Sequence, residues 1–175
     1  VLAGGFDHSY CINDHNRNFN PQQHTLDDAP LPPVKSGSGY YSPTGIAQHA
    51  IDMLGEHQAK HQDQPFFLYL AFIVPHFPLH ALPQDIAVYK DRYQAGWDVI
   101  RAGRCQRMKK LGIINCDLSK LEPEAAPRWN LTEAELSKQI SPNEVGHAVP
   151  WDSLTPGQKE FQAAKMAIHA AMVHR

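Results

Sequence analysis

The chain has 175 residues and a formal net charge of −2, with 42% hydrophobic and 19% charged residues. This composition is typical of a globular protein, and the length is enough to bury a core. The near-zero net charge argues against a broad basic surface for nucleic acid or anionic membranes. The longest apolar run, Phe66–Val74, is less than half of the ~20 residues that a membrane-spanning helix needs.

The first element with a clear pattern is a helix predicted near residues 43–60. Residues 1–39 are rich in Asn, Asp, Gly and Pro and predict loops on the surface. Ser42 is a good N-cap and Pro43 suits the first helical turn. One apolar face of this helix is formed by Ile46, Ala50, Met53 and Leu54.

The segment FFLYLAFIV, Phe66–Val74, predicts a buried strand. It is apolar without alternation and lies between Pro65 and Pro75, which limit it to the length of a strand, although a buried helix competes with this interpretation. Burial on both faces is typical of a central strand in a parallel sheet. Such a strand needs neighbours, and no other segment has a similar pattern, so we expect its partners outside this chain.

The second half of the chain predicts helices. A short one begins at Pro83, a longer one covers residues 97–110 and ends at Leu111-Gly112, and LTEAELSKQ suggests another within the mostly irregular residues 113–154. In the final helix Thr155 and Gln158 can form a capping box. The apolar stripe of that helix is expected at Phe161, Ala164, Ile168, Ala171 and Met172.

Both ends of the sequence suggest an internal segment of a longer protein. The chain starts at Val1 without an initiator methionine, and it ends at Arg175 inside a helical pattern that no glycine, asparagine or proline closes. A processed mature chain is the alternative. We expect residues 1–175 to be part of a single domain, truncated at both ends.

Most candidate reactive groups have simpler structural explanations. The three cysteines, Cys11, Cys105 and Cys116, form no C-x-x-C pair, and nothing in their surroundings assigns them a role. His57 and His61 have zinc-ligand spacing but lie in a polar stretch that predicts a solvated helix end. Turn formation better explains the possible ligands in FDHSYCINDHN, namely Asp7, His8, Asp14 and His15.

His76 is the candidate that remains. It follows the predicted strand in the segment PHFPLH, where Pro75 and Pro78 restrict the backbone. Ligands of open α/β sheets bind beyond the carboxyl ends of strands, and an imidazole can donate a proton near neutral pH. A structural histidine that hydrogen-bonds the backbone of a tight turn is an equal alternative on local features.

The segment PFFLYLAFIVPHFPLHALPQDIAVYKDRYQAGWD resembles the central part of type I sulfatases, the arylsulfatase family of the alkaline-phosphatase superfamily. The shared pattern is a P-F-F-L-Y-L-A-F strand, a P-H-x-P-L turn and a Y-x-x-x-Y-x-x-G-W-D approach to a helix. GGFDHSY, YYSPTGIAQHAIDML and VPWDSLTPGQKEFQAAKMAIHAAMVHR are similar to other parts of the family. The resemblance covers nearly the whole chain.

The resemblance implies an α/β fold: a fragment of an alkaline-phosphatase-like three-layer domain with a mostly parallel central sheet. It implies a sulfuric ester hydrolase with a formylglycine nucleophile and a bound Ca²⁺. His76 matches the family histidine that contacts the sulfate and the leaving-group oxygen, so both a catalytic and a substrate-binding role are implied for it. His80 could line the same pocket but carries no assigned role.

Several family motifs are missing from this chain. There is no C/S-x-P-x-R nucleophile motif, no K-x-H pair and no downstream D-N, and Asp27-Asp28 lie in the wrong place to be the family's early Asp pair. We therefore expect the nucleophile and the calcium ligands outside the chain, assign no metal ligand within it, and expect the chain alone to be inactive.

The implied partner is a small-molecule or carbohydrate sulfate ester, not a nucleic acid. Periplasmic or extracellular localisation follows from the family, although the sequence begins without a signal-peptide pattern. Two alternatives stay open: a related phosphodiesterase or phosphonate hydrolase, and a non-catalytic sulfatase-like module.

Overall fold

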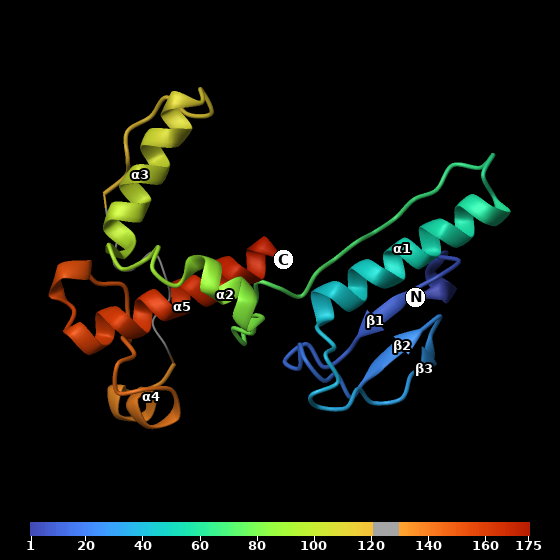
Figure 1. Cartoon of the computed structure of the whole chain (residues 1–175), viewed down its shortest axis with the longest axis horizontal. Coiled ribbons are helices and arrows are strands. Elements are labelled where there is room, and N and C mark those ends of the chain that lie inside the picture. Colours follow the sequence, from blue (N-terminus) through green and yellow to red (C-terminus); the bar gives the residue numbers. More distant parts are fainter. Residues whose placement is uncertain (121–129) are drawn as a thin grey trace. The chain divides into compact units, whose positions relative to one another are not determined.

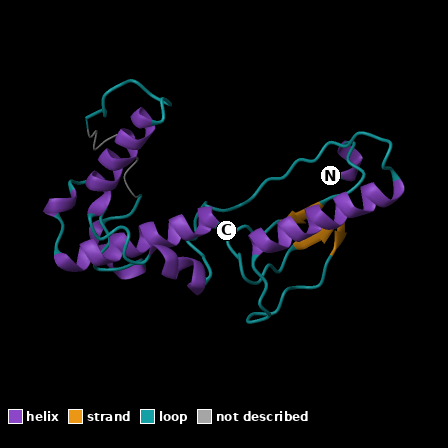
Figure 2. Ribbon diagram, turned by 45° about the horizontal axis from the view of Figure 1, so that its top comes forward, coloured by secondary structure: helices purple, strands orange, loops and turns teal. Residues whose placement is uncertain are grey.

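The computed structural model describes residues 1–120 and 130–175, which form two compact units. The first contains Val1–His80 with Met172–Arg175, and the second contains Ala81–Ala171. The first unit combines one long helix with a small sheet and loops, and the second unit is mainly helical (Figures 1 and 2). Within the described residues, no helix combines the length and apolar character needed to cross a membrane.

A small antiparallel sheet corrects the prediction that residues 1–39 form only loops. After a 3₁₀ helix, Leu2–Gly4, strand β1 (Tyr10–Ile12) pairs with β2 (His24–Leu26), and β2 pairs with β3 (Ala29–Pro30). The β2–β3 turn consists of Asp27 and Asp28, whose φ angles of 50° and 62° suit a two-residue hairpin. Strands of two or three residues are too short to produce a detectable period.

Helix α1, Ser42–Lys60, confirms the predicted first helix, but the predicted N-cap is wrong. Tyr41 occupies the N-cap in an extended conformation and Ser42 lies inside the first turn. The Ser42 hydroxyl donates to Asn18 Oδ1 at 2.7 Å, and its backbone N–H donates to the Asn18 carbonyl at 2.7 Å. A tertiary contact to Asn18 therefore uses the hydroxyl that was expected to cap the helix.

The predicted strand Phe66–Val74 is not formed. The segment is extended and runs back alongside α1 (Figures 1 and 2), but it pairs with no strand of the described residues. Its side chains are largely exposed, with Phe67 at 78% and Tyr69 at 73%. The central parallel sheet is accordingly not present among the described residues, because an extended segment becomes a strand only when a neighbour completes its hydrogen bonds.

The second unit confirms the predicted helices. They are α2 (Pro83–Tyr89), α3 (Gly96–Lys110), α4 (Glu133–Gln139) and α5 (Pro156–His174), with a 3₁₀ helix at Trp151–Ser153. The capping box of α5 is also confirmed. The Thr155 N–H donates to Gln158 Oε1 at 3.0 Å, and the Gln158 N–H donates to Thr155 Oγ1 at 3.3 Å.

The apolar stripe of α5 is displaced from the predicted one. Ala171 and Met172 are buried as expected, but Ala164 is exposed, and the buried face continues instead through Ala163 and Ala167. Of the other predicted positions, Phe161 and Ile168 are half-buried, so only Ala164 was wrongly placed. The sequence pattern did not identify Ala163 and Ala167 as members of the buried face.

Trp151 is the centre of the core in the second unit. Its ring packs edge-on against Trp97, with 4.9 Å between centroids, and its backbone N–H donates to Asp98 at 2.9 Å. Gly96, which opens α3 with φ of 83°, lies against the face of the indole, where an added Cβ would overlap the ring. Both the positive φ and this close approach require glycine.

Gly96→Ala should therefore destabilise the chain more than Gly112→Ala, because both glycines have a positive φ but only Gly96 lies against another side chain. Gly112 has φ of 70° and open space around it, so Gly112→Ala measures the backbone cost alone, about 1 kcal/mol. We expect Gly96→Ala to lose about 1–3 kcal/mol more, from overpacking against Trp151. Urea unfolding of both variants tests this, and equal losses would contradict the packing argument.

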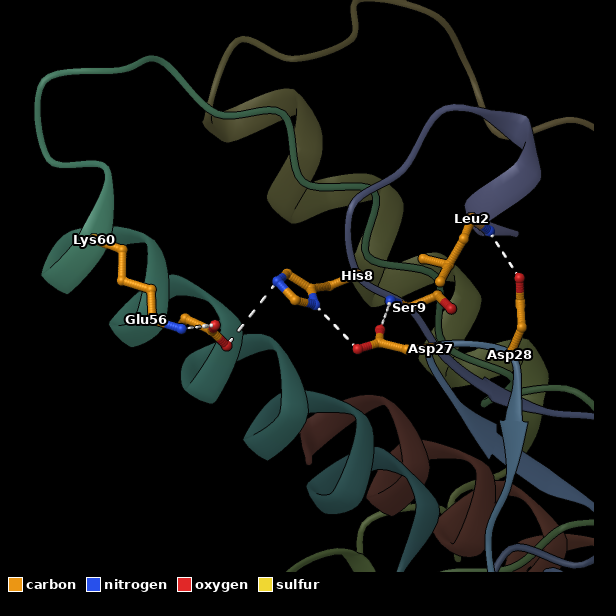
Figure 3. Close-up of polar contacts among 7 residues, drawn as sticks. All are labelled: Leu2, His8, Ser9, Asp27, Asp28, Glu56 and Lys60. Atoms are coloured by element: carbon orange, nitrogen blue, oxygen red, sulfur yellow. Dashed lines mark hydrogen bonds and ion pairs between the residues drawn. The ribbon is translucent and has the colours of Figure 1, made fainter.

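A polar cluster joins the N-terminal segment to the β2–β3 turn (Figure 3). His8 Nδ1 lies 3.1 Å from Asp27 Oδ2, and Asp27 Oδ1 accepts the Ser9 N–H at 2.8 Å. The second ring nitrogen of His8 lies 4.0 Å from Glu56 on α1. The hydrogen bond to Asp27 raises the pKa of His8 against the opposing effect of burial, while the Ser9 N–H and then His8 lower the pKa of Asp27.

These shifts predict a small pH-dependent contribution to stability. Because the folded state raises the pKa of His8, its contribution is complete below the unfolded value of ~6.5 and is lost as the pH rises through the folded value. The side chains are more than a third exposed, so we expect only a few tenths of a kcal/mol. In an NMR titration, the His8 midpoint should be higher in the wild type than in Asp27→Asn. Identical His8 midpoints would contradict this assignment.

Candidate active-site turn

The turn after Val74 presents His76 at the surface. The His76 N–H donates to the Ile73 carbonyl at 3.1 Å, and the side chain turns back so that Nδ1 lies 2.8 Å from the Phe77 carbonyl. The peptide bonds before Pro75 and Pro78 are both cis. The imidazole is exposed, so the turn holds the ring in place without covering it.

This geometry fixes which ring nitrogen of His76 is available for chemistry. A carbonyl oxygen can only accept, so Nδ1 must carry a hydrogen and donate to Phe77. Nε2 has no hydrogen-bond partner among the described residues. It can accept a hydrogen bond when the ring is neutral, and it can donate to an anion or a leaving group when the ring is protonated. The backbone hydrogen bond expected of a structural histidine is therefore formed as well. It occupies Nδ1 only and leaves Nε2 available.

The structure places His15 beside His76. The two rings meet edge-on with 6.3 Å between centroids, and both are exposed. Asp14 fixes the loop that carries His15, because its carboxylate accepts the N–H of Gln22 at 2.7 Å. The turn interpretation explains Asp14 well, but no sequence pattern predicts that His15 lies near the PHFPLH segment.

Buried residues of α1 and its preceding loop support the far end of the turn. The Tyr41 hydroxyl donates to the His80 carbonyl at 2.8 Å. The Phe19 ring lies 5.1 Å from the Tyr41 ring and 5.5 Å from the His80 ring. Asn18, which is 1% exposed, holds Ser42 next to them. These contacts attach the His76–His80 segment to the folded part of the unit.

His80 lies in this supporting layer. Burial lowers the pKa of its imidazole, and its buried Nδ1 has no hydrogen-bond partner among the described residues. The ring therefore favours the neutral form. The ring of His80 packs against Phe19 and so contributes to the structure of the unit. The expectation that His80 lines the same pocket as His76 stays a prediction.

A hollow of about 510 Å³ lies directly before His76 in the first unit. Most of its walls are apolar, and the terminal Arg175 contributes a charge at its edge. The lining residues come from the start of α1, the end of the extended segment and the C-terminus: Pro43, Thr44, Ala47, Phe72, Val74, Pro75, Met172, Val173 and Arg175. The hollow could accept an organic group, and its wall ends at Pro75, the residue before His76 in the chain.

The other candidate ligands do not come together. His8 binds Asp27 and Asp14 binds the backbone of Gln22, in agreement with the turn interpretation. His57 Nε2 lies 2.9 Å from the Gln64 carbonyl near the end of α1. In residues 1–120 and 130–175, no three side chains of the types His, Cys, Asp and Glu gather as a metal site would require.

The cysteines share neither a bond nor a location. Cys11 is half-buried in β1, Cys105 is buried in α3 and Cys116 is exposed, and all three are free thiols. None of them lies at the His76 turn, so they add nothing to the candidate site.

Comparison with known proteins gives a consistent result. The family described as Sulfatase matches residues 3–140, which include the whole His76 turn. The chain is similar to an uncharacterized sulfatase of Schizosaccharomyces pombe (strain 972), with 35% identity over 139 residues, covering 79% of this chain and 21% of that protein. It is also similar to an arylsulfatase of Klebsiella aerogenes, with 28% identity over 180 aligned positions, covering 97% of this chain and 33% of that protein.

The chain thus spans about a fifth to a third of the length of these relatives. The family match covers well over half of this chain and contains the predicted histidine turn. The resemblance inferred from the sequence is therefore confirmed, and the chain belongs to the sulfatase family.

Proposed function

We propose that this chain is part of a sulfate ester hydrolase and that His76 is its contribution to the active site. The observation that carries the proposal is the exposed His76 ring, anchored through Nδ1 with Nε2 left available, inside the region that matches the family. The similarity to a protein named arylsulfatase supports sulfate esters, rather than phosphate or phosphonate esters, as the substrate class.

In this proposal His76 acts on the leaving group. Hydrolysis breaks the bond between sulfur and the ester oxygen, and that oxygen needs a proton to depart as an alcohol. The protonated Nε2 can donate this proton, while its charge also attracts the sulfate oxygens. The Nδ1 contact to Phe77 keeps the ring orientation during the transfer. General acid catalysis of this kind typically contributes a factor of 10²–10⁴ in rate.

The nucleophile and the metal are proposed to come from outside this chain. In the family that the sequence resembles, the nucleophile is a formylglycine beside Ca²⁺. The described residues do not fit a calcium site, since no group of three suitable ligands exists among them. We therefore derive no step through the metal from these residues.

A small-molecule or carbohydrate sulfate ester is the proposed substrate. The hollow of about 510 Å³ before His76 offers an apolar surface for the organic part of such an ester. Residues 8–39 and 115–150 are proposed to shape specificity, although residues 121–129 lie outside the described part of the chain. Export to the periplasm or the cell exterior is proposed because many members of the family are exported.

His76→Ala, introduced into the full-length protein, should lower kcat/KM for an aryl sulfate by about 10²–10⁴, because the leaving oxygen loses its proton donor. An aryl sulfate with a much better leaving group should lose less, since its oxygen needs no proton. His169→Gln serves as the matched control, because His169 is exposed on α5 and has no described partner. Equal activity of His76→Ala and the control would contradict the assigned role.

The isolated chain should show no turnover, whereas the full-length protein should hydrolyse an aryl sulfate faster than the matching aryl phosphate. Assays of both proteins on both esters measure this. Turnover by the isolated chain would show that the nucleophile lies within it. A full-length protein that prefers the phosphate ester would support the phosphodiesterase alternative, and inactivity on both esters would support the non-catalytic module.

A further inference from the structure

The second unit contains a cavity of about 550 Å³ to which neither the family match nor the proposed function gives a role. Its lining residues come from α3, from α5 and from the segment 144–149. The apolar part of the lining consists of Trp97, Ile100, Val145, Ala148, Val149 and Met166. None of the lining residues belongs to the His76 turn.

One of the two acidic side chains of the cavity is paired with a cation. The side chain of Glu144, 2% exposed, accepts from Lys165 at 2.6 Å and from Gln162 at 2.8 Å. Asp98 accepts the Trp151 N–H at 2.9 Å. Lys165 and Glu144 offset each other's charge, whereas Asp98 keeps its negative charge.

Two arginines of the lining outweigh the single carboxylate of Asp98. Arg101 and Arg104 are three residues apart on α3, so they project from the same face of the helix into the lining. One nitrogen of Arg101 donates to the carbonyl and hydroxyl of Ser119, at 2.7 and 2.8 Å, which holds the guanidinium in place. Its other N–H groups, and all those of Arg104, have no partner among the described residues.

We propose that this cavity binds a small organic anion whose carboxylate or sulfonate-type group pairs with Arg101 and Arg104. Guanidinium groups bind such oxyanions through paired, charge-assisted hydrogen bonds. The apolar lining, which includes Trp97 and Met166, then takes the aromatic or branched body of the ligand. Charge complementarity and the mixed lining together select this class over neutral or cationic ligands.

The proposal can be tested on this chain with three probes of one shape: 2-naphthalenesulfonate, 2-naphthoate and neutral 2-naphthalenemethanol. Calorimetry should show binding of at least one anion that is at least about tenfold tighter than binding of the alcohol. Arg104→Gln should weaken anion binding about tenfold and leave the alcohol unaffected. Arg107→Gln is the matched control, since Arg107 is exposed on the same helix and does not line the cavity.

NMR can show whether the anion binds in this cavity. The indole N–H of Trp97, which donates to the Val149 carbonyl at 3.0 Å, should shift on addition of anion in the wild type. Circular dichroism confirms that each variant is folded. Binding of one anion alone would support the proposal and identify the preferred oxyanion. Equal binding of the alcohol, equal effects of both arginine substitutions, or an unchanged Trp97 signal would each overturn it.

Discussion

Tyr41 joins the three segments that make up the candidate active-site turn. Its side chain is 2% exposed, its hydroxyl donates to the His80 carbonyl and its ring packs on Phe19. Because it also precedes α1 directly, it connects the N-terminal loop, the helix and the His76–His80 segment. The position of His76 is therefore a tertiary property, set by contacts far away in the sequence, and the local prolines restrict only the shape of the turn.

The helices could be predicted because their signals are local. Pro43, Pro83 and Pro156 lie in first turns, the Thr155–Gln158 capping box is formed, and Gly112 with φ of 70° follows α3. The errors involve long-range competition. The Ser42 hydroxyl donates a hydrogen bond to Asn18, twenty-four positions earlier in the chain. A rule based on neighbouring residues cannot predict that partner. The three short strands depend on pairing between segments that show no period of their own.

The segment Phe66–Val74 illustrates what an apolar run does and does not determine. A segment of this composition is stable as a strand only in apolar surroundings and with hydrogen-bond partners on both edges. Nothing within the described residues meets that requirement, and the side chains stay exposed. An exposed apolar run of this size is a ready surface for pairing or aggregation. Since the chain spans about a third or less of its relatives, we propose that a longer protein provides the neighbours.

The candidate site was predictable in part. His76 could be singled out because its sequence setting is unusual and resembles a family motif, and the match to the sulfatase family supports that choice. His15 could not, since only the fold brings the two rings within 6.3 Å of each other. The most direct test is a structure of the full-length protein with an arylmethanesulfonate bound, in which an S–C bond replaces the S–O ester bond and resists hydrolysis. We predict His76 Nε2 within about 3.2 Å of an oxygen on the sulfur. A ligand bound with its sulfur group out of reach of His76 would contradict this account.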